Sequence, residues 1–196
     1  MALTGLFLVT FLAVHLTINL FTLIDKDLFN EASHFMASNP LIQIMQYVLA
    51  LGFIFHIGTG IILTRANQKA RPVNYANNKP GENSSLSSRT MIQTGMLVFV
   101  FLLIHLYNYY YKMKFIGVDD DYILVTELFG HWQYTLIYVV SFILLGIHLN
   151  HGFQSAFQSV GANHRKYTPW IKKIGAVYSV LIAAGFSLIA IYHCIN

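Results

Sequence analysis

Five long apolar runs, separated by shorter polar connections, restrict the fold of this chain more than any other feature of its sequence. A helix needs roughly 20 residues to cross about 30 Å of hydrocarbon, and each run is long enough to do so. A segment surrounded by lipid must satisfy its own backbone hydrogen bonds, so all five runs should be helices. We therefore expect an all-α integral membrane protein whose single membrane domain covers residues 1–196. The five transmembrane helices are predicted at about residues 1–24, 41–64, 90–111, 133–156 and 172–194.

The low charge content also indicates a surface that faces lipid. Only 10% of the residues are charged, 56% are hydrophobic, and the mean hydropathy is +0.55. A soluble domain usually carries about 25% charged residues, so this chain has too few to cover a surface in water. The single cysteine, Cys194, excludes an internal disulfide framework and a cysteine-rich metal or iron–sulfur site.

The connections between the apolar runs alternate in charge, which predicts the orientation of the chain. Residues 25–40 and 111–131 are acidic, whereas residues 65–89 and 157–173 are basic. Positive charge near the ends of spans stays in the cytoplasm, so we expect the N-terminus inside and the C-terminus outside. The first run starts at Met1 without a polar flank or a cleavage pattern, so either this start is late or an N-terminal segment is missing. The net charge of +4 then reflects topology, and no nucleic-acid partner is expected.

Spans one and three repeat one motif. The first copy reads TGLFLVTFLAVHL and the second TGMLVFVFLLIHL, and the histidines of these copies are His15 and His105. Spans two and four share a shorter motif, His-x-x-x-Gly, which contains His56 and His148. Duplication of a helical hairpin explains the repeat, but it does not explain why each copy keeps its histidines.

The depth of these histidines groups them into two layers. Spans one and three run outward, so His15 and His105 lie in the outer half of the membrane. Spans two and four run inward, and His56 and His148 lie in the inner half. From the helical rise and the membrane thickness, the two layers should be roughly 10–15 Å apart.

Two stacked pairs of histidines suit haem iron better than zinc. An ionisable residue inside a membrane is a functional hypothesis by default, although interhelical hydrogen bonding is a frequent alternative. Zinc usually needs three or four protein ligands, whereas a porphyrin leaves two axial positions of its iron for imidazoles. Each histidine would bind through Nε2 and donate its Nδ1–H to an acceptor, such as a carbonyl one turn back. We predict two low-spin haems that carry electrons, in a four-helix haem-binding bundle of spans one to four with span five packed outside.

Two glycines support this interpretation. Gly60 and Gly152 lie one turn beyond His56 and His148, on the same face of each helix. Without side chains at these positions, a flat macrocycle can approach the helix; close packing of helices is the alternative reason for glycine here.

In these motifs the sequence resembles the single-chain, five-helix, di-haem cytochrome b subunit of succinate dehydrogenase or fumarate reductase (succinate:quinone oxidoreductase). The resemblance rests on MALTGLFLVTFLAVHLTINL in span one, FIFHIGTG in span two, TGMLVFVFLLIHLYN in span three and GIHLNHGFQSAFQSVG in span four. It covers nearly the whole chain, with His151 in place of the asparagine of the family's His-x-x-Asn-Gly signature. It implies a distal haem b held by His15 and His105 and a proximal haem b held by His56 and His148.

The resemblance also implies partners and a location. A flavoprotein subunit with covalent FAD and an iron–sulfur subunit with its clusters would dock on the cytoplasmic face of a bacterial inner membrane. We expect residues 65–90 and 157–171 to form the docking surface. Electrons would pass between succinate and a quinone, with menaquinone as the expected quinone, while the dicarboxylate chemistry would reside on the partner subunits. The direction of the reaction and any higher oligomer of the complex stay open.

Further polar residues are candidates for contacts to these cofactors. Glu31 is the candidate for proton transfer to the quinone, and a solvated acidic loop is the alternative reading of its position. Arg65 and Arg89 suit haem propionates, but equally suit positive anchors at the cytoplasmic face. The other candidates are His151 for a propionate, and Asn19, His34 and Asn108 for the quinone.

Gly146 departs from the resembled family, and other functions stay open. Some fumarate reductases of this type carry a Glu two residues before the span-four ligand, where this chain has Gly146, so that proton route is in doubt. The chain could instead be the di-haem cytochrome b of a hydrogenase, a formate dehydrogenase or an ascorbate-type system. A haem-free, proton-coupled transporter is a third reading, although such a protein usually has carboxylates inside its spans.

Overall fold

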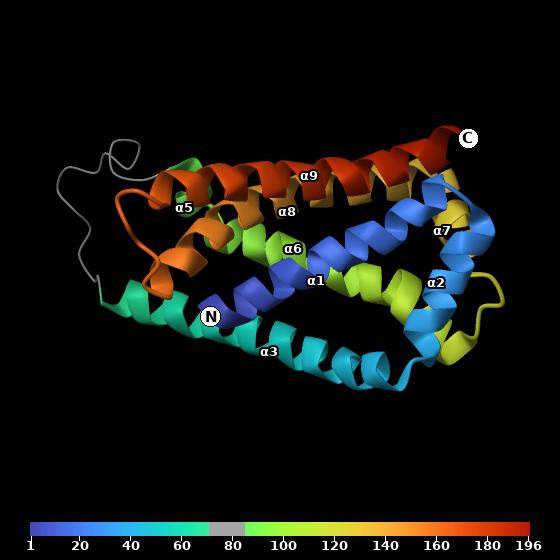
Figure 1. Ribbon diagram of the computed structural model, residues 1–196, viewed down its shortest axis with the longest axis horizontal. Coiled ribbons are helices and arrows are strands. Elements are labelled where there is room, and N and C mark those ends of the chain that lie inside the picture. The colour runs from blue at the N-terminus through green and yellow to red at the C-terminus, as the bar shows by residue number, and fades with distance from the viewer. Residues whose placement is uncertain (71–84) are drawn as a thin grey trace.

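The computed structural model describes residues 1–70 and 85–196, and this part of the chain consists of helices joined by short connections (Figure 1). The all-α class and the five spans that the sequence predicts are confirmed. The helices long and apolar enough to cross a membrane are Ala2–Leu23, Pro40–Lys69, Met91–Ile116, Trp132–Ser159 and Thr168–Ile195. In chain order the elements are α1 (Ala2–Leu20), η1 (Phe21–Leu23), α2 (Lys26–Ser38), α3 (Pro40–Lys69), α5 (Leu86–Arg89), α6 (Met91–His105), η2 (Leu106–Ile116), α7 (Asp121–Gly130), α8 (Trp132–Ser159) and α9 (Thr168–Ile195).

Local sequence signals set the beginnings of several helices. At the start of α3, the Asn39 side chain accepts hydrogen bonds from the backbone N–H groups of Leu41 and Ile42. Pro40 follows as the first helical residue, where its missing N–H costs nothing. Helix α6 ends at His105, and the chain continues without a break as the wider helix η2. This helix ends at Gly117, which has φ 82° and whose backbone N–H donates to the carbonyl of Lys112.

The two acidic connections, for which the sequence pattern predicts loops, contain helices. Asp25 caps α2 and Asp120 caps α7, each through a hydrogen bond from a backbone N–H three residues further on. Apolar side chains anchor both helices, since Phe29, Val125 and Phe129 are buried. Figure 1 shows α2 and α7 together at one end of the bundle. We call this the acidic end.

Polar contacts join α2 to α7. Lys26 forms an ion pair with Asp120, and Asn30 donates to Asp120 at 3.0 Å and accepts from the backbone N–H of Tyr122 at 2.9 Å. Ser33 donates to Asp121. The hydrogen bond from Lys26 is the main reason that the pKa of Asp120 falls to about 2. The connection between spans one and two is thus tied to the connection between spans three and four.

The opposite end of the bundle carries the basic residues, and we call it the basic end. It contains the C-terminal end of α3, α5, and the turn between α8 and α9 (Figure 1). Its described cations are Arg65, Lys69, Arg89, Arg165, Lys166, Lys172 and Lys173. Residues 71–84, which belong to the expected docking surface, lie outside the described residues.

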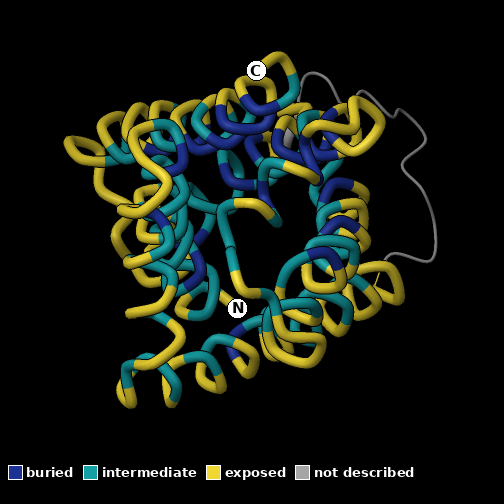
Figure 2. The backbone as a smooth tube through the Cα atoms, turned by 90° about the vertical axis from the view of Figure 1, so that its right-hand side faces the viewer, coloured by how far each residue is buried: buried dark blue, intermediate teal, exposed yellow. Residues whose placement is uncertain are grey.

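Helix α9 packs along α8 and α1, beside the four spans that carry the histidines, and it is the most buried of the five spans. Its most apolar stretch is 33% buried, whereas that of α3 is only 6% buried. Small residues allow its close approach: a Cβ at Gly146 of α8 would lie 3.0 Å from the Cβ of Ala183, and one at Gly185 would lie 2.8 Å from Leu16 of α1. Figure 2 shows the buried positions gathered on the side of the bundle away from α3. Periodicity alone could not show this, because packing partners depend on small residues on specific faces.

Candidate functional site

The structure brings the four intramembrane histidines together as two pairs. The ring centres of His15 (α1) and His105 (α6) are 5.8 Å apart, and those of His56 (α3) and His148 (α8) are 6.4 Å apart. The planes of the two rings are nearly perpendicular in both pairs, at 85° and 79°. All four residues are half-buried. These are the same pairs that membrane depth indicates from the sequence.

The spacing within each pair is compatible with two imidazoles that bind one metal ion. A bond from a metal to an imidazole nitrogen is about 2 Å long, and the ring centre lies about 1 Å further, so two such rings have centres about 6 Å apart. Among residues 1–70 and 85–196, no group of three or more His, Cys, Asp or Glu side chains could hold a metal ion. Each pair would therefore supply two protein ligands to a bound metal ion.

The Thr-Gly motif of each repeat packs against the inner histidine of the neighbouring span. Thr4 Oγ1 lies 3.5 Å from His56 Nδ1. Thr94 Oγ1 lies 3.4 Å from His148 Nδ1. In both copies the residue after the threonine is a glycine. A Cβ at Gly5 would lie 3.5 Å from Cε1 of His56, and a Cβ at Gly95 would lie 3.2 Å from Cε1 of His148. The sequence indicated the repeat but not this contact between helices.

This contact also fixes how far apart the two layers lie. The inner rings contact Gly5 and Gly95, and each outer histidine is ten residues further along the same helix. Ten residues of α-helix rise about 15 Å. Both halves of the repeat therefore place the inner and outer pairs at two depths in the bundle.

The glycines after the inner histidines face methionines rather than open space. A Cβ at Gly60 would lie 3.3 Å from Cε of Met1, and one at Gly152 would lie 3.6 Å from Cε of Met91. Both methionines lie four residues before the glycine of their Thr-Gly motif. The face that the sequence assigned to a macrocycle is thus covered by a flexible thioether side chain in each copy.

The outer pair is surrounded by aromatic rings. His15 stacks on Phe11 with ring centres 5.3 Å apart and lies 5.5 Å from Phe186 of α9. His105 lies 5.2 Å from Tyr109 and 6.2 Å from Tyr138. These rings cover the outer pair with an apolar wall to which four different helical segments contribute.

Buried polar groups next to His105 form a cluster that the sequence revealed only in part. Asn108 donates to the hydroxyl of Tyr138 at 3.0 Å, and these residues are only 4% and 1% exposed. The hydroxyl of Tyr109 and Nδ1 of His105 are buried and have no hydrogen-bond partner among the described residues. Asn108 was a candidate from the sequence, but Tyr138 and Tyr109 were not. A tyrosine among the apolar residues in the first part of its span was the available signal for Tyr138.

The remaining candidates lie apart from the histidine pairs or serve them locally. Asn19 donates to the backbone carbonyl of His15 at 2.8 Å, and its Nδ2 lies 3.4 Å from Nδ1 of that ring. Glu31 and His34 are exposed on α2 at the acidic end. Arg65 and Arg89 are exposed at the basic end, and His151 is half-buried one turn beyond His148.

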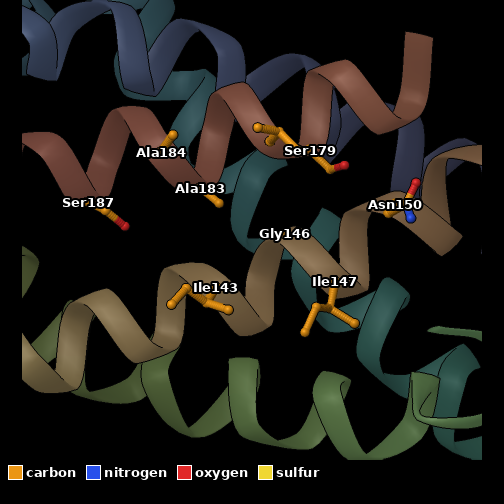
Figure 3. A pocket seen from close by; sticks show the side chains of 9 residues that line it. Ile143, Gly146, Ile147, Asn150, Ser179, Ala183, Ala184 and Ser187 are labelled. Carbon is orange, nitrogen blue, oxygen red and sulfur yellow. The ribbon is translucent and has the colours of Figure 1, made fainter. Parts of the chain in front are cut away.

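Gly146 faces α9, not the histidine pairs. It lies at a groove of about 410 Å³ between α8 and α9, opposite Ala183 (Figure 3). A Cβ there would also lie 3.3 Å from the carbonyl oxygen of Ser179. A side chain at this position would therefore press against Ala183 and the backbone of Ser179 on α9.

Comparisons with known proteins identify no relative: no family model, no curated protein and no solved structure matches the chain.

Proposed function

We propose that this chain is the haem b-bearing membrane anchor of a succinate:quinone oxidoreductase and carries electrons between an iron–sulfur subunit and a membrane quinone. The observation that carries the proposal is the geometry of two imidazole pairs, with ring centres 5.8 and 6.4 Å apart, at two depths of one helical bundle. Two histidine pairs at two depths suit electron transfer across the membrane better than they suit a single catalytic centre. The motifs of spans one to four, described above, supply the family part of the proposal.

The four histidines would hold two haems, which when bound supply one-electron transfer. His15 and His105 would hold the distal group, and His56 and His148 the proximal one. The aromatic side chains around the outer pair exclude water from it, and a dry site strengthens the electrostatic effect of every nearby dipole. With two histidines on each group, the sites would transfer electrons rather than bind oxygen.

The quinone would bind near the outer pair. The hydroxyls of Tyr109 and Tyr138 and the amide of Asn108 are the buried polar groups beside His105, and they suit hydrogen bonds to quinone oxygens. Glu31 and His34, exposed at the acidic end, would exchange protons with water. Menaquinone is the proposed quinone.

The partners would dock at the basic end. Its cations match the charge pattern of a cytoplasmic face, so the N-terminus would lie in the cytoplasm of a bacterium and the acidic end outside. A flavoprotein with covalent FAD and an iron–sulfur subunit would cover this end. Arg65, Arg89 and His151 would then lie between the proximal haem and the iron–sulfur subunit.

The transporter reading is disfavoured by the spans themselves. The five described spans contain no Asp or Glu, whereas proton-driven carriers usually place such carboxylates within the membrane. A di-haem cytochrome b of another respiratory complex would use the same four histidines, so the co-purifying partner must distinguish the two.

The test is purification of the complex through a tag on this chain. We expect a flavoprotein with covalently bound FAD, an iron–sulfur protein, and reduction of the haems by succinate. The matched control is the same preparation with malonate, a competitive dicarboxylate, which should prevent reduction by succinate but not by dithionite. Co-purification of a hydrogenase or formate dehydrogenase, with reduction by hydrogen or formate and not by succinate, would contradict the proposal.

A further inference from the structure

The two inner histidines share a feature that the outer histidines lack. Each has its Nδ1 next to a threonine hydroxyl of the preceding span, at 3.5 Å for Thr4 and His56 and at 3.4 Å for Thr94 and His148. The two threonines occupy the same position in the two copies of the repeat. The contact therefore occurs twice, between two different pairs of helices.

The direction of these contacts follows from counting protons. A threonine hydroxyl has one proton and two lone pairs. Thr4 donates its proton to the carbonyl of Met1 at 2.8 Å. The Thr94 hydroxyl donates to the carbonyl of Thr90 at 2.9 Å, and the carbonyl of Met91 lies 3.1 Å away as a second acceptor. With its proton on the carbonyl, each hydroxyl offers a lone pair toward the imidazole, and a hydrogen bond between the two groups is then donated by Nδ1.

This direction selects the tautomer of the imidazole. A neutral histidine that carries its proton on Nδ1 has a lone pair on Nε2, and that lone pair can bind a metal. Outer-shell acceptors of this kind orient a metal-binding imidazole and raise its basicity. The sequence suggested a carbonyl one turn back as the acceptor; in the structure the threonine hydroxyl lies beside the backbone of Met1 at His56 and of Met91 at His148, which also interact with these rings.

The glycine of the motif makes the contact possible. The ring of His148 lies against Gly95, where a Cβ would be 3.2 Å from Cε1, tighter than most real contacts of this kind. The equivalent distance at Gly5 is 3.5 Å. Threonine followed by glycine thus supplies an acceptor and clearance for the ring at adjacent positions.

The outer pair has different surroundings. The group beside Nδ1 of His15 is the Asn19 amide nitrogen, which also donates to the backbone carbonyl of His15. Nδ1 of His105 has no hydrogen-bond partner among the described residues. The threonine contacts are therefore specific to the inner layer.

We infer that Thr4 and Thr94 are positioning residues for the inner pair, holding the imidazoles of His56 and His148 so that Nε2 of each is free to bind the proximal haem iron. This inference rests on the proposed function. The O···N distances are longer than the usual 2.7–3.2 Å of such hydrogen bonds, so the contact must be tested by its effect on the iron. Loss of the acceptor makes the imidazole a weaker electron donor, which favours the reduced iron.

The experiment compares Thr94→Val, Thr4→Val and Thr94→Ser in the purified complex. Valine has nearly the shape of threonine without its hydroxyl, and serine keeps the hydroxyl. The readouts are a redox titration of each haem band, the electron paramagnetic resonance signals of the oxidised haems, and the haem content per chain. Thr10→Val is the matched control, because the Thr10 hydroxyl donates only to the carbonyl of Leu6 in its own helix.

We expect each valine variant to shift the midpoint potential of one haem to more positive values, with a changed resonance signal, and to leave the other haem unchanged. Thr94→Ser should retain the original potential, and Thr10→Val should change neither haem. Selective loss of one haem in Thr94→Val, but not in Thr94→Ser, would support the same role. Unchanged potentials in both valine variants, or equal shifts of both haems, would overturn the inference. A wild-type chain without haem would instead overturn the proposed function.

Discussion

His15 and His105 face each other from α1 and α6 with their ring centres 5.8 Å apart, although 90 positions separate them in the sequence. The second pair, His56 and His148, repeats this arrangement at another depth, with ring centres 6.4 Å apart. Helix α9 adds Phe186 to the surroundings of His15, so the outer pair depends on all of α1, α6 and α9. This arrangement of two histidine pairs is the basis of the proposed electron relay.

Replacement of single histidines should divide them into the same two pairs. His15→Ala and His105→Ala should each remove one haem and spare the other, and His56→Ala and His148→Ala should remove the second, because each haem needs two imidazoles. The measurement is the difference spectrum of each variant with its haem content per chain. His34→Ala, at an exposed position on α2, is the control and should keep both haems. If His15→Ala abolished the signal that is lost in His56→Ala, the pairing would be wrong.

A methyl group at Gly146 should weaken the packing of α8 against α9. In Gly146→Ala the Cβ would lie 3.0 Å from the Cβ of Ala183 and 3.3 Å from a backbone oxygen, and neither of these atoms can rotate away. We expect the free energy of unfolding to fall by about 1–3 kcal/mol, as for other overpacked sites. The matched control is Gly58→Ala, because nothing lies within 4 Å of a Cβ there. This control should be neutral or stabilising by about 0.5–1 kcal/mol, since alanine is the better helix former. Equal thermal stability of the two variants in one detergent would contradict the packing of α8 against α9.

Tyr138→Phe should destabilise the protein through its partner. The Asn108 amide would lose its acceptor while remaining buried, which costs about 1–3 kcal/mol. Thermal unfolding should show the loss, and Tyr134→Phe, at an exposed position on α8, should not. Adding Asn108→Leu to Tyr138→Phe should recover part of the stability, because no polar atom of the pair is then left unpaired. A double variant less stable than the sum of its single changes would argue against this explanation.

The ion pair between Lys26 and Asp120 should hold α2 and α7 together over a wide pH range. The hydrogen bond from Lys26 lowers the pKa of Asp120 to about 2, helped by the Ile123 N–H and the Asn30 amide. The same contact with Asp120 raises the pKa of Lys26. A carboxylate with a lowered pKa stabilises the fold above about pH 4 and loses that contribution as the pH falls toward about 2; the lysine contribution holds until the pH rises past about 10.

Hydrogen exchange of the α7 amides can test this. The loss of protection in Asp120→Asn, relative to wild type, should be constant between about pH 5 and 8 and shrink below about pH 3. It should also decrease at high salt, because the pair is near the surface. Asp119→Asn, at the adjacent exposed position, is the control and should change little. A loss of protection that varies steeply between about pH 5 and 8 would show that another group holds α7 in place.

The sequence predicted the parts of the structure that depend on local patterns. Hydrophobic length indicated the five spans, and the position of each histidine along its span indicated which histidines lie at the same depth. The structure differs where contacts between helices decide. The polar composition of the two acidic connections predicts loops, but Asp25 and Asp120 cap helices there, and Phe29 and Val125 bury apolar side chains.

The surroundings of the histidines could not be predicted for a similar reason. Thr4 and His56 are 52 positions apart in the sequence, and only the packing of α1 against α3 brings them together. Burial of α9 depends on which faces carry Gly175, Ser179 and Gly185, and a hydropathy pattern does not specify the partner of each face. The repeat was the available signal for this contact. A contact needed by both halves should occur in both copies, and the Thr-Gly motif contacts a histidine in each copy.

The most direct test of the central claim is the number of haems bound to this chain. The complex would be purified in mild detergent, and a reduced-minus-oxidised spectrum would be recorded with a pyridine haemochrome assay and a protein determination. The two imidazole pairs predict two low-spin b haems per chain, one of which is reduced by succinate more readily than the other. A purified, folded chain without haem would contradict the account, and the four histidines would then have to serve proton transfer or packing.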